Sequence, residues 1–496
     1  AGTGATGERF KNEDHVYSGD LDLFGRGGLF ELLSAARTPM GENRLAAWLL
    51  GPSATEAILD RHNSVNTLRG KIDLRENLAL IGEDLRATLN PETLVSWAET
   101  PPTMRMAFFR GIGVALGLCA VAALVYLLET AILWPLIVVL AVEMIVLRFL
   151  QPAAVEVLTG VDCNADGLIL FSKILARLER EQFDSPQLQK FAEMLKSGER
   201  PASRAVRKIA RIVYWSDART SLLGSILNLP LLYTLQLGYA ADAWRGRWGG
   251  RMRLWVDATA ELEALLSLAT YSYEHPNDPF PEIMVNGEIA AIFDGEELGH
   301  PLIPAAQCVR NSARLNREKP LILVSGSNMS GKSTFLRTVG INTVLAMAGA
   351  PVRGKRLRLT PLTLGTRIRT SDSLQEGRSN FYAEILRIRA VFELAADRFK
   401  LLFLFDELLE GTNSKDRRIG AEGLIRALLA RGAIGIVSTH DLALTEMTDA
   451  LNQSVWNAHF QDYVEDGKMR FDYKLREGVV AKSNALELMR LVGLKV

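Results

Sequence analysis

The sequence predicts an α plus α/β fold, in which a helical core with an apolar helical hairpin precedes a domain built on a mainly parallel sheet. Apolar residues recur at helical spacing through 21–104 and again through 151–275. Between these parts, 105–150 is strongly apolar and carries few charges. Farther along, short runs of bulky apolar residues end in polar loops, which is typical of buried parallel strands. The predicted domains are a flexible leader (1–20), two parts of a helical core (21–104 and 151–275), the hairpin (105–150) and the sheet domain (276–496).

The balanced charge of the chain gives no global electrostatic attraction to nucleic acid. Its 496 residues contain 57 Lys and Arg against 57 Asp and Glu, so contact with nucleic acid would need a local basic patch. The three cysteines (Cys119, Cys163 and Cys308) lie far apart without metal-ligand spacing, and they predict neither a disulfide framework nor a metal site. Residues 1–8 are small and show no signal-peptide pattern; whether the natural chain extends before Ala1 stays open.

Residues 107–147 predict a hairpin of two membrane-spanning helices. Gly111–Leu128 contains no charged residue, and a second uncharged run extends over 131–142, after which the apolar character continues to residue 147. An α-helix needs about 20 apolar residues to cross the bilayer core, so each run is near the lower limit. The alternative is a hairpin buried inside a soluble domain or a dimer interface.

Basic residues flank this hairpin on both sides. Arg105 and Arg110 precede the first apolar run and Arg148 follows the second apolar stretch, which predicts that both ends lie on the cytoplasmic side of the cell (inner) membrane. The domain after the hairpin would then be cytoplasmic. No role is assigned to Glu143, the carboxylate that follows the second uncharged run and interrupts the apolar stretch ending at residue 147.

The second part of the helical core leaves two questions open. An apolar stretch at 221–240 has polar interruptions, which favours a buried core helix over a third membrane span. Two basic clusters could bind phosphate groups of nucleic acid or lipid, or form solvated helix faces. The first basic cluster is Arg204, Arg207, Lys208 and Arg211; the second basic cluster is Arg245, Arg247, Arg251 and Arg253, interleaved with Trp244, Trp248 and Trp255.

The strongest local signal is LILVSGSNMSGKST at 321–334. Four apolar residues predict a buried strand, and the loop after it fits the pattern G-x-x-x-x-G-K-[ST] before a helical segment. Such a loop wraps nucleotide phosphates with backbone N–H groups and a helix N-terminus. Lys332 would reach the β- and γ-phosphates, and Ser333 would ligate Mg²⁺. We expect nucleotide contacts from the whole loop, which comprises Gly326, Ser327, Asn328, Met329, Ser330, Gly331, Lys332, Ser333 and Thr334.

Two further strands would bring catalytic side chains to the same edge of the sheet. The apolar run 401–405 ends in Asp406 and Glu407, and 433–437 leads to His440. Ligands of open α/β sheets bind beyond the carboxyl ends of the strands. Asp406 would hold Mg²⁺, Glu407 would orient or deprotonate the attacking water, and His440 would contact the γ-phosphate or the water.

These motifs carry a resemblance to the MutS family of ABC-type ATPases. The phosphate loop resembles that family's loop in its Asn-Met pair, and TSDSLQEGRSNFYAE at 370–384 resembles the second motif. DELLEGTNSKDR at 406–417 is similar to the third motif and Ser438-Thr439-His440 to the fourth. Weaker likeness covers 38–65, 299–301 and 480–493.

The resemblance implies a homodimeric ATPase that binds ATP and Mg²⁺ between two subunits. By this analogy Ser379 would reach the γ-phosphate bound to the partner, and the turn at 411–413 would line the dimer interface. The family's DNA-repair members also have a mismatch-reading domain and a DNA clamp. This sequence resembles the family from the helical core onward, and it has the apolar hairpin where the clamp-bearing helices would lie.

Departures from the family pattern argue against mismatch reading. In the third motif Leu409-Glu410 replace a Gly-Arg pair and Asn413 replaces a serine. The sequence therefore predicts a membrane-anchored, homodimeric ATPase whose ATP cycle moves helical arms. The alternatives are a DNA-binding clamp that acts on branched or duplex DNA, and a scaffold that uses ATP only as an assembly switch.

Overall fold

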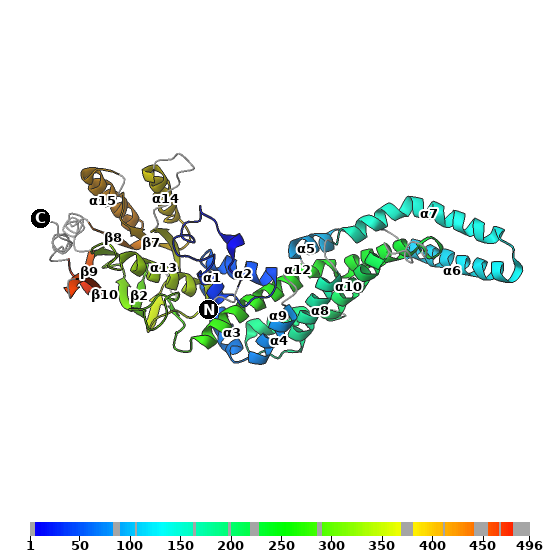
Figure 1. The fold of residues 1–496 in the computed structure, drawn as a ribbon, viewed down its shortest axis with the longest axis horizontal. Coiled ribbons are helices and arrows are strands. Elements are labelled where there is room, and N and C mark those ends of the chain that lie inside the picture. Colours follow the sequence, from blue (N-terminus) through cyan, green and yellow to red (C-terminus); the bar gives the residue numbers. More distant parts are fainter. Residues whose placement is uncertain are drawn as a thin grey trace. The chain divides into compact units, whose positions relative to one another are not determined.

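The computed structural model describes residues 5–82, 90–104, 107–161, 165–196, 200–218, 228–284, 290–368, 380–409, 412–440, 455–465 and 468–479. The chain divides into two compact units, and Figure 1 labels their elements. The first unit contains Ala1–Ala35, Leu45–Gly70 and Ser267–Val496, and the second contains Ala36–Arg44 and Lys71–Leu266. Residues 1–35 and 45–70 thus belong with the sheet domain, which the predicted boundaries did not include.

The first unit is built on a six-stranded sheet in the order β10-β9-β4-β8-β7-β6. Its strands are β4 (Leu321–Ser325), β6 (Leu362–Arg367), β7 (Lys400–Asp406), β8 (Ile434–Thr439), β9 (Val455–Glu465) and β10 (Lys468–Glu477). All neighbours pair in parallel except β9 and β10, which confirms the predicted mainly parallel sheet. Every residue of β4 and β8 is buried, as expected for strands covered on both faces.

Helices cover both faces of this sheet. The described helices that lie wholly within this unit are η1 (Glu8–Phe10), α1 (Leu29–Leu33), α3 (Thr55–Arg69), α13 (Lys332–Ala348), α14 (Asn380–Leu394) and α15 (Ser414–Ala430). Val391 of α14 and Ile425 of α15 pack with Phe403 and Phe405 in one apolar cluster. On the other face, Gly340 of α13 approaches Leu404 so closely that an added Cβ would lie 3.0 Å from it. Large residues on β7 therefore fix the position of the helix that follows the phosphate loop.

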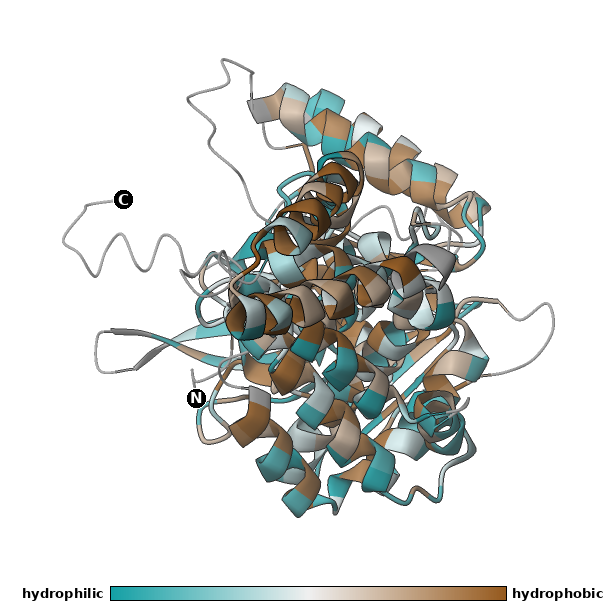
Figure 2. Ribbon diagram, turned by 90° about the vertical axis from the view of Figure 1, so that its right-hand side faces the viewer, coloured by the Kyte–Doolittle hydropathy of each residue, from teal (hydrophilic) through white to brown (hydrophobic). Residues whose placement is uncertain are grey.

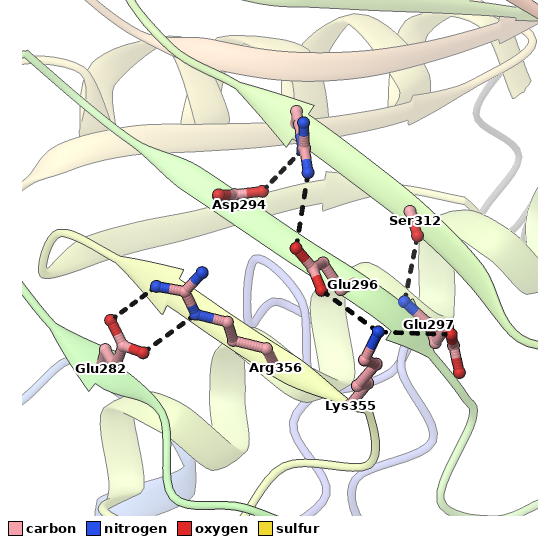
Figure 3. A network of polar contacts seen from close by, with 8 residues as sticks. Glu282, Asp294, Glu296, Glu297, Ser312, Lys355 and Arg356 are labelled. Atoms are coloured by element: carbon pink, nitrogen blue, oxygen red, sulfur yellow. Dashed lines mark hydrogen bonds and ion pairs between the residues drawn. The ribbon is translucent and has the colours of Figure 1, made fainter.

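A smaller sheet in the same unit carries a surface network of ion pairs. It consists of β1 (Glu282–Ile283), β5 (Arg356–Leu359), β2 (Phe293–Leu298) and β3 (Asn311–Leu315) in that spatial order. Figure 3 shows Arg356 facing Glu282 across β5 and β1, with Lys355 between Glu296 and Glu297. These side chains are largely exposed, so each pair contributes at most about 1 kcal/mol. The network is a surface feature of this sheet, and none of its residues was predicted to act in catalysis.

Residues 5–20 form part of the first unit, so the expectation of a flexible leader is wrong for them. Val16 accepts a hydrogen bond from the Thr366 backbone N–H (2.9 Å), at the outer edge of β6. The buried carboxylate of Asp20 accepts from the Thr366 hydroxyl (2.7 Å) and from the Ile368 N–H (3.0 Å). The sequence gave no indication of these contacts of Val16 and Asp20, because the residues that they bind lie about 350 residues farther along the chain.

Asp20→Ala is expected to lower the free energy of unfolding of the first unit by about 2 kcal/mol, because two donors would lose their acceptor in a buried place. Urea unfolding of the full chain measures this change. Asp14→Ala is the matched control, since the Asp14 side chain is exposed and its removal should cost less than about 0.5 kcal/mol. Equal losses in both variants would contradict the role of Asp20.

The second unit is helical, as predicted. Its helices are α4 (Ile72–Gly82), α5 (Pro91–Glu99), α6 (Ala107–Thr130), α7 (Trp134–Thr159), α8 (Ala165–Arg180), α9 (Pro186–Lys196) and α10 (Ala202–Ala218). Two more helices, α2 (Pro39–Leu49) and α12 (Tyr233–Glu274), contribute residues to both units. The indole rings of Trp97 and Trp244 stack with centroids 5.8 Å apart, and both are buried.

A buried carboxyl group makes the stability of the second unit depend on pH. Glu263 accepts hydrogen bonds from the Thr38 hydroxyl (2.5 Å) and the Thr38 N–H (3.2 Å). Burial, together with the nearby Glu42 charge, raises the pKa of Glu263 to about 7. The folded state therefore favours the protonated acid. This stabilisation is complete below the ordinary pKa near 4.5 and is lost as the pH rises through 7.

We expect the contribution of Glu263 to the free energy of unfolding of wild type to fall by about 2 to 3 kcal/mol between pH 5 and pH 8. The reason is that each unit of pKa difference between the folded and unfolded states corresponds to about 1.4 kcal/mol. Glu263→Gln removes the ionisation and keeps an amide oxygen for Thr38, so the variant should lack that part of the slope. Urea unfolding of both proteins at the two pH values, followed by tryptophan fluorescence, measures the difference. Parallel slopes in wild type and variant would contradict the assignment.

Helices α6 and α7 form the expected hairpin, joined by residues 131–133. Both are long and apolar enough to cross a membrane by length and composition. Only 22% of the apolar window in α6 and 11% of that in α7 is buried within the chain. In Figure 2, which is coloured by hydropathy, the ribbons of these two helices consist mostly of hydrophobic residues. Exposed large side chains include Val114, Leu118, Leu124, Leu128, Trp134, Ile137, Met144, Ile145 and Phe149.

The base of the hairpin packs on the start of α12. Leu147 and Ala154 of α7 form a buried cluster with Leu232, Leu235 and Tyr239. The described part of the apolar stretch 221–240 is thus largely core, whereas residues 221–227 lie outside the described ranges. Glu143 is completely buried, and neither of its carboxyl oxygens has a hydrogen-bond partner among the described residues.

The two basic clusters differ in their surroundings. In the second basic cluster, Arg245 is buried against Asp242 (2.5 Å) and Arg253 pairs with Glu99 (2.6 Å). Its three tryptophans are buried in the helical core. The first basic cluster lies on one exposed face of α10. All four side chains of the first basic cluster are thus exposed, whereas Arg245 of the second is buried.

Candidate active site

The predicted motifs meet at one edge of the large sheet. Strands β4, β8 and β7 are adjacent and parallel, so their carboxyl ends lie side by side. The phosphate loop follows β4, Asp406 ends β7, and His440 follows β8 directly. The predicted chemistry requires these three strand ends to be neighbours, and the strand order makes them so.

Two glycines shape the phosphate loop. Gly326 (φ +153°) and Gly331 (φ +108°) adopt backbone conformations that side chains disfavour. A Cβ on Gly326 would lie 2.8 Å from the Ser330 hydroxyl and 3.1 Å from the Phe460 carbonyl oxygen. Gly331 is the N-cap of α13, whose first turn contains no acidic residue. The loop therefore leaves the positive end of the helix open to an anion.

Lys332 is the buried cation of this edge. Its side chain is 5% exposed, and its ammonium group donates to the carbonyl oxygens of Gly326 (2.8 Å) and Ser327 (3.0 Å). The same Nζ atom lies 3.5 Å from Oε1 of Glu407. The loop and the acidic strand end are thus connected by one charged side chain.

Glu407 lies between two positively polarised groups. Its Oε1 atom is 3.5 Å from Lys332 Nζ and 3.4 Å from Nδ1 of His440. The Glu407 backbone has φ +52°, and its N–H donates to the Ser438 carbonyl oxygen at 3.2 Å. The structure therefore brings together the three predicted catalytic residues, with the carboxylate partly open to solvent.

Asp406 and Ser333, the predicted Mg²⁺ ligands, border the same place. The Asp406 side chain is buried and accepts a hydrogen bond from the Ser438 hydroxyl. Ser333 is half-buried in the first turn of α13. Within the described ranges there is no cluster of three or more His, Cys, Asp or Glu residues that could hold a metal alone. A Mg²⁺ ion would therefore share its coordination with nucleotide phosphates and water.

The loop fits a polyphosphate by one further observation. The hydroxyl oxygens of Ser327 and Ser330 are buried, and neither has a hydrogen-bond partner among the described residues. Buried hydroxyl groups normally have partners, so two such groups beside Lys332 match an oxygen-rich ligand. Asn328, Met329 and Thr334 are exposed, with Met329 at φ +69° on the outside of the loop.

Some predicted residues are not brought to the site by the described structure. Ser379 lies in 369–379 and Gly411 in 410–411, both outside the described residues. Asn413 caps α15 by accepting from the Asp416 N–H (2.9 Å). Its role in a dimer interface stays a prediction.

Three side chains at this edge were not predicted. Ser438 was quoted only as part of the fourth motif, and Glu384 only as the last residue of the second motif. Both nevertheless form hydrogen bonds with the backbone or side chains around Asp406 and Glu407. Arg367, at the end of β6, donates to the Asp406 carbonyl oxygen. Its signal was available, because a charged residue at the carboxyl end of a buried strand faces the ligand edge of such a sheet.

Comparison with known proteins agrees with this geometry. Residues 322–495 match the family model described as MutS domain V. The chain is 31% identical over 252 residues to a protein named DNA mismatch repair protein MutS from Geobacillus thermodenitrificans, covering 50% of this chain and 27% of that protein. It is 34% identical over 203 residues to Endonuclease MutS2 from Thermus thermophilus, covering 39% of this chain and 25% of that protein.

A third relative, DNA mismatch repair protein MutS 2 from Halobacterium salinarum, is 30% identical over 248 residues, which cover 49% of this chain and 28% of that protein. The chain thus matches about a quarter of the length of these curated relatives. The matched region contains the phosphate loop, both acidic residues and His440. Residues 322–495 of the chain are therefore a MutS domain V, the part of the chain that it shares with these MutS and MutS2 proteins.

Proposed function

We propose that the protein is an ATPase of the MutS type. The observation that carries this proposal is the position of Glu407, 3.5 Å from Lys332 and 3.4 Å from His440. It lies beside a phosphate loop with two buried hydroxyls that have no hydrogen-bond partner among the described residues. A base, a phosphate-binding cation and a polar histidine at one strand edge are the parts that phosphoryl transfer to water requires.

Each residue has one task in this reaction. The backbone N–H groups of the loop and Lys332 bind the β- and γ-phosphates, and Ser333 with Asp406 would hold Mg²⁺. The metal ion neutralises charge that develops on the phosphate oxygens. Glu407 orients the attacking water and takes its proton, and His440 contacts the water or the γ-phosphate.

We further propose that two copies share each nucleotide, as the MutS resemblance implies. Ser379 of one copy would reach the γ-phosphate held by the other. Hydrolysis would then depend on association of two subunits, and the ATP state would change the position of the helical arms.

The protein is also proposed to be anchored in the cell membrane through residues 107–147. The support is the number of large apolar side chains that α6 and α7 leave exposed, among them Leu118, Leu128 and Phe149, which are 66%, 78% and 77% exposed. Water would solvate such a surface at a cost of about 25 cal/mol for each Å² of apolar area. A bilayer removes that cost, and a cytoplasmic sheet domain keeps its site in contact with ATP.

Fractionation of the full-length protein tests these proposals together. We expect it to sediment with membranes, to resist extraction with carbonate and to dissolve in detergent. Its mass in detergent should double on addition of ATP, and it should release phosphate. Recovery in the soluble fraction would contradict the anchor alone, whereas absence of phosphate release by protein that binds ATP would contradict the ATPase.

The second candidate function is a DNA-binding clamp without mismatch reading. It is favoured by the first basic cluster on the exposed face of α10 and by the printed names of the relatives, which refer to mismatch repair and to an endonuclease. Gel shifts on duplex, branched and single-stranded DNA test it. Phosphate contacts by these side chains would make the affinity fall steeply with salt, and a variant of the cluster would bind with a shallower slope.

A further inference from the structure

The backbone that carries Glu407 is strained. Glu407 and Leu409 both have positive φ angles, +52° and +58°, although neither is glycine. Residues in such conformations persist only where their surroundings fix them, and they are concentrated at functional sites. The contacts that fix 406–409 therefore determine where the Glu407 carboxylate lies.

Arg367 holds the first half of this stretch. It ends β6, which runs parallel to β7 with Arg367 opposite Phe405. Its Nη1 atom donates to the carbonyl oxygens of Asp406 (2.7 Å) and Glu407 (3.3 Å). One guanidinium group thus bonds to the peptide carbonyls of both acidic residues.

Glu384 of α14 holds the second half. Its Oε1 atom accepts from the Leu409 N–H (2.8 Å) and lies 3.3 Å from Nη2 of Arg367. The side chains of this pair are 8% and 4% exposed. Together they form a buried bridge from the Asp406 and Glu407 carbonyls to the Leu409 N–H, across the strained residues.

Stability alone gives no reason for this bridge. A buried ion pair contributes little net stability, and apolar residues of similar volume often replace one without loss. Among the described hydrogen bonds and ion pairs, neither side chain contacts the phosphate loop. Their effect on the site therefore has to pass through the backbone of 406–409.

We propose that Arg367 and Glu384 are positioning residues that hold the Glu407 carboxylate between Lys332 and His440. This inference rests on the proposed ATPase function, because it assigns the pair to the hydrolytic step and not to nucleotide binding. A carboxylate displaced by about 1 Å from its productive position loses on the order of 100-fold in rate.

The test compares a double variant that removes the ion pair with a single variant that keeps its hydrogen bonds. Arg367→Met/Glu384→Leu removes both charges, so no buried charge is left without a partner. We expect its kcat for ATP hydrolysis to fall about 100-fold, while KM changes less than about threefold. Glu384→Gln keeps an oxygen that can accept from the Leu409 N–H and from Arg367, and it should retain kcat within about threefold of wild type.

A matched control is the Arg353–Asp278 pair, which lies in the same unit, is 3.4 Å apart and has side chains that are 13% and 2% exposed. Arg353→Met/Asp278→Asn should change the melting temperature by about as much as Arg367→Met/Glu384→Leu does. It should leave kcat within about twofold of wild type. A kcat loss in this control equal to that of the Arg367 and Glu384 variant would overturn the proposal. So would an unchanged kcat in Arg367→Met/Glu384→Leu.

An experimental structure of Arg367→Met/Glu384→Leu separates failure of this inference from failure of the proposed function. Wild type that binds ATP without hydrolysing it would reject the ATPase, and the structure would still measure the Glu407 position. We expect its carboxylate to leave Lys332 and His440 by more than about 1 Å. A carboxylate that keeps the wild-type distances of 3.5 Å to Lys332 and 3.4 Å to His440 would overturn the positioning role of Arg367 and Glu384.

Discussion

Glu407→Gln is expected to lower the rate of ATP hydrolysis by about 10² to 10⁴-fold, the usual contribution of a positioned general base. The substitution keeps the size of the side chain and its contacts with Lys332 and His440, but the amide cannot take a proton from water. ATP should still bind, so the variant should accumulate as an ATP-bound dimer. Phosphate release and light scattering in detergent measure the two effects.

Glu422→Gln is the control for this prediction. Glu422 lies on α15 and pairs only with Arg426 of the same helix at 2.7 Å, among the ion pairs of the described residues. Its substitution should leave turnover within about twofold of wild type. If Glu407→Gln hydrolysed ATP at the wild-type rate, Glu407 would not be the base.

Lys332→Ala is expected to weaken ATP binding by about 30- to 4000-fold, which corresponds to the about 2 to 5 kcal/mol that truncation of a buried charged hydrogen-bond partner costs. The ammonium group is almost inaccessible and bonds to the carbonyls of Gly326 and Ser327 at the mouth of the loop. Without it the phosphates face these carbonyls and the Glu407 carboxylate with no cation between them. Equilibrium binding of a fluorescent ATP analogue measures the change.

The control for this second prediction is Lys319→Ala. Lys319 is exposed and precedes β4, at the end of the strand opposite to the phosphate loop. Its loss should change the affinity for the analogue by less than about twofold. A Lys332→Ala variant with wild-type affinity would show that the loop does not bind phosphate through this side chain.

The site could be predicted from sequence where its parts are local. The phosphate loop is defined by spacing within 14 residues, and a strand that ends in Asp406-Glu407 needs only the rule that parallel strands present ligands at their carboxyl ends. His440 followed from the same rule. The structure confirms the mainly parallel sheet. It places Lys332 3.5 Å and His440 3.4 Å from the Glu407 carboxylate.

Other contacts could not be predicted because they join distant parts of the chain. Asp20 and Thr366 are 346 residues apart, and no periodicity relates them. Arg367 and Glu384 are separated by a segment whose path the sequence does not specify. For Trp244, Trp248 and Trp255, helical spacing left a surface role and a core role open, and burial decided for the core. Membrane residence of 107–147 stays a prediction, since length and composition are its only direct indications.

The covering of β6 by the N-terminal residues has a consequence for solubility. β6 is the last strand of its sheet, and an uncovered last strand offers its free peptide groups as a template for strands of other molecules. Val16 and Asp20 occupy part of that template at Thr366 and Ile368. A chain shortened to begin at residue 21 would therefore expose unpaired peptide groups along β6. Such a chain should aggregate before its nucleotide binding is impaired.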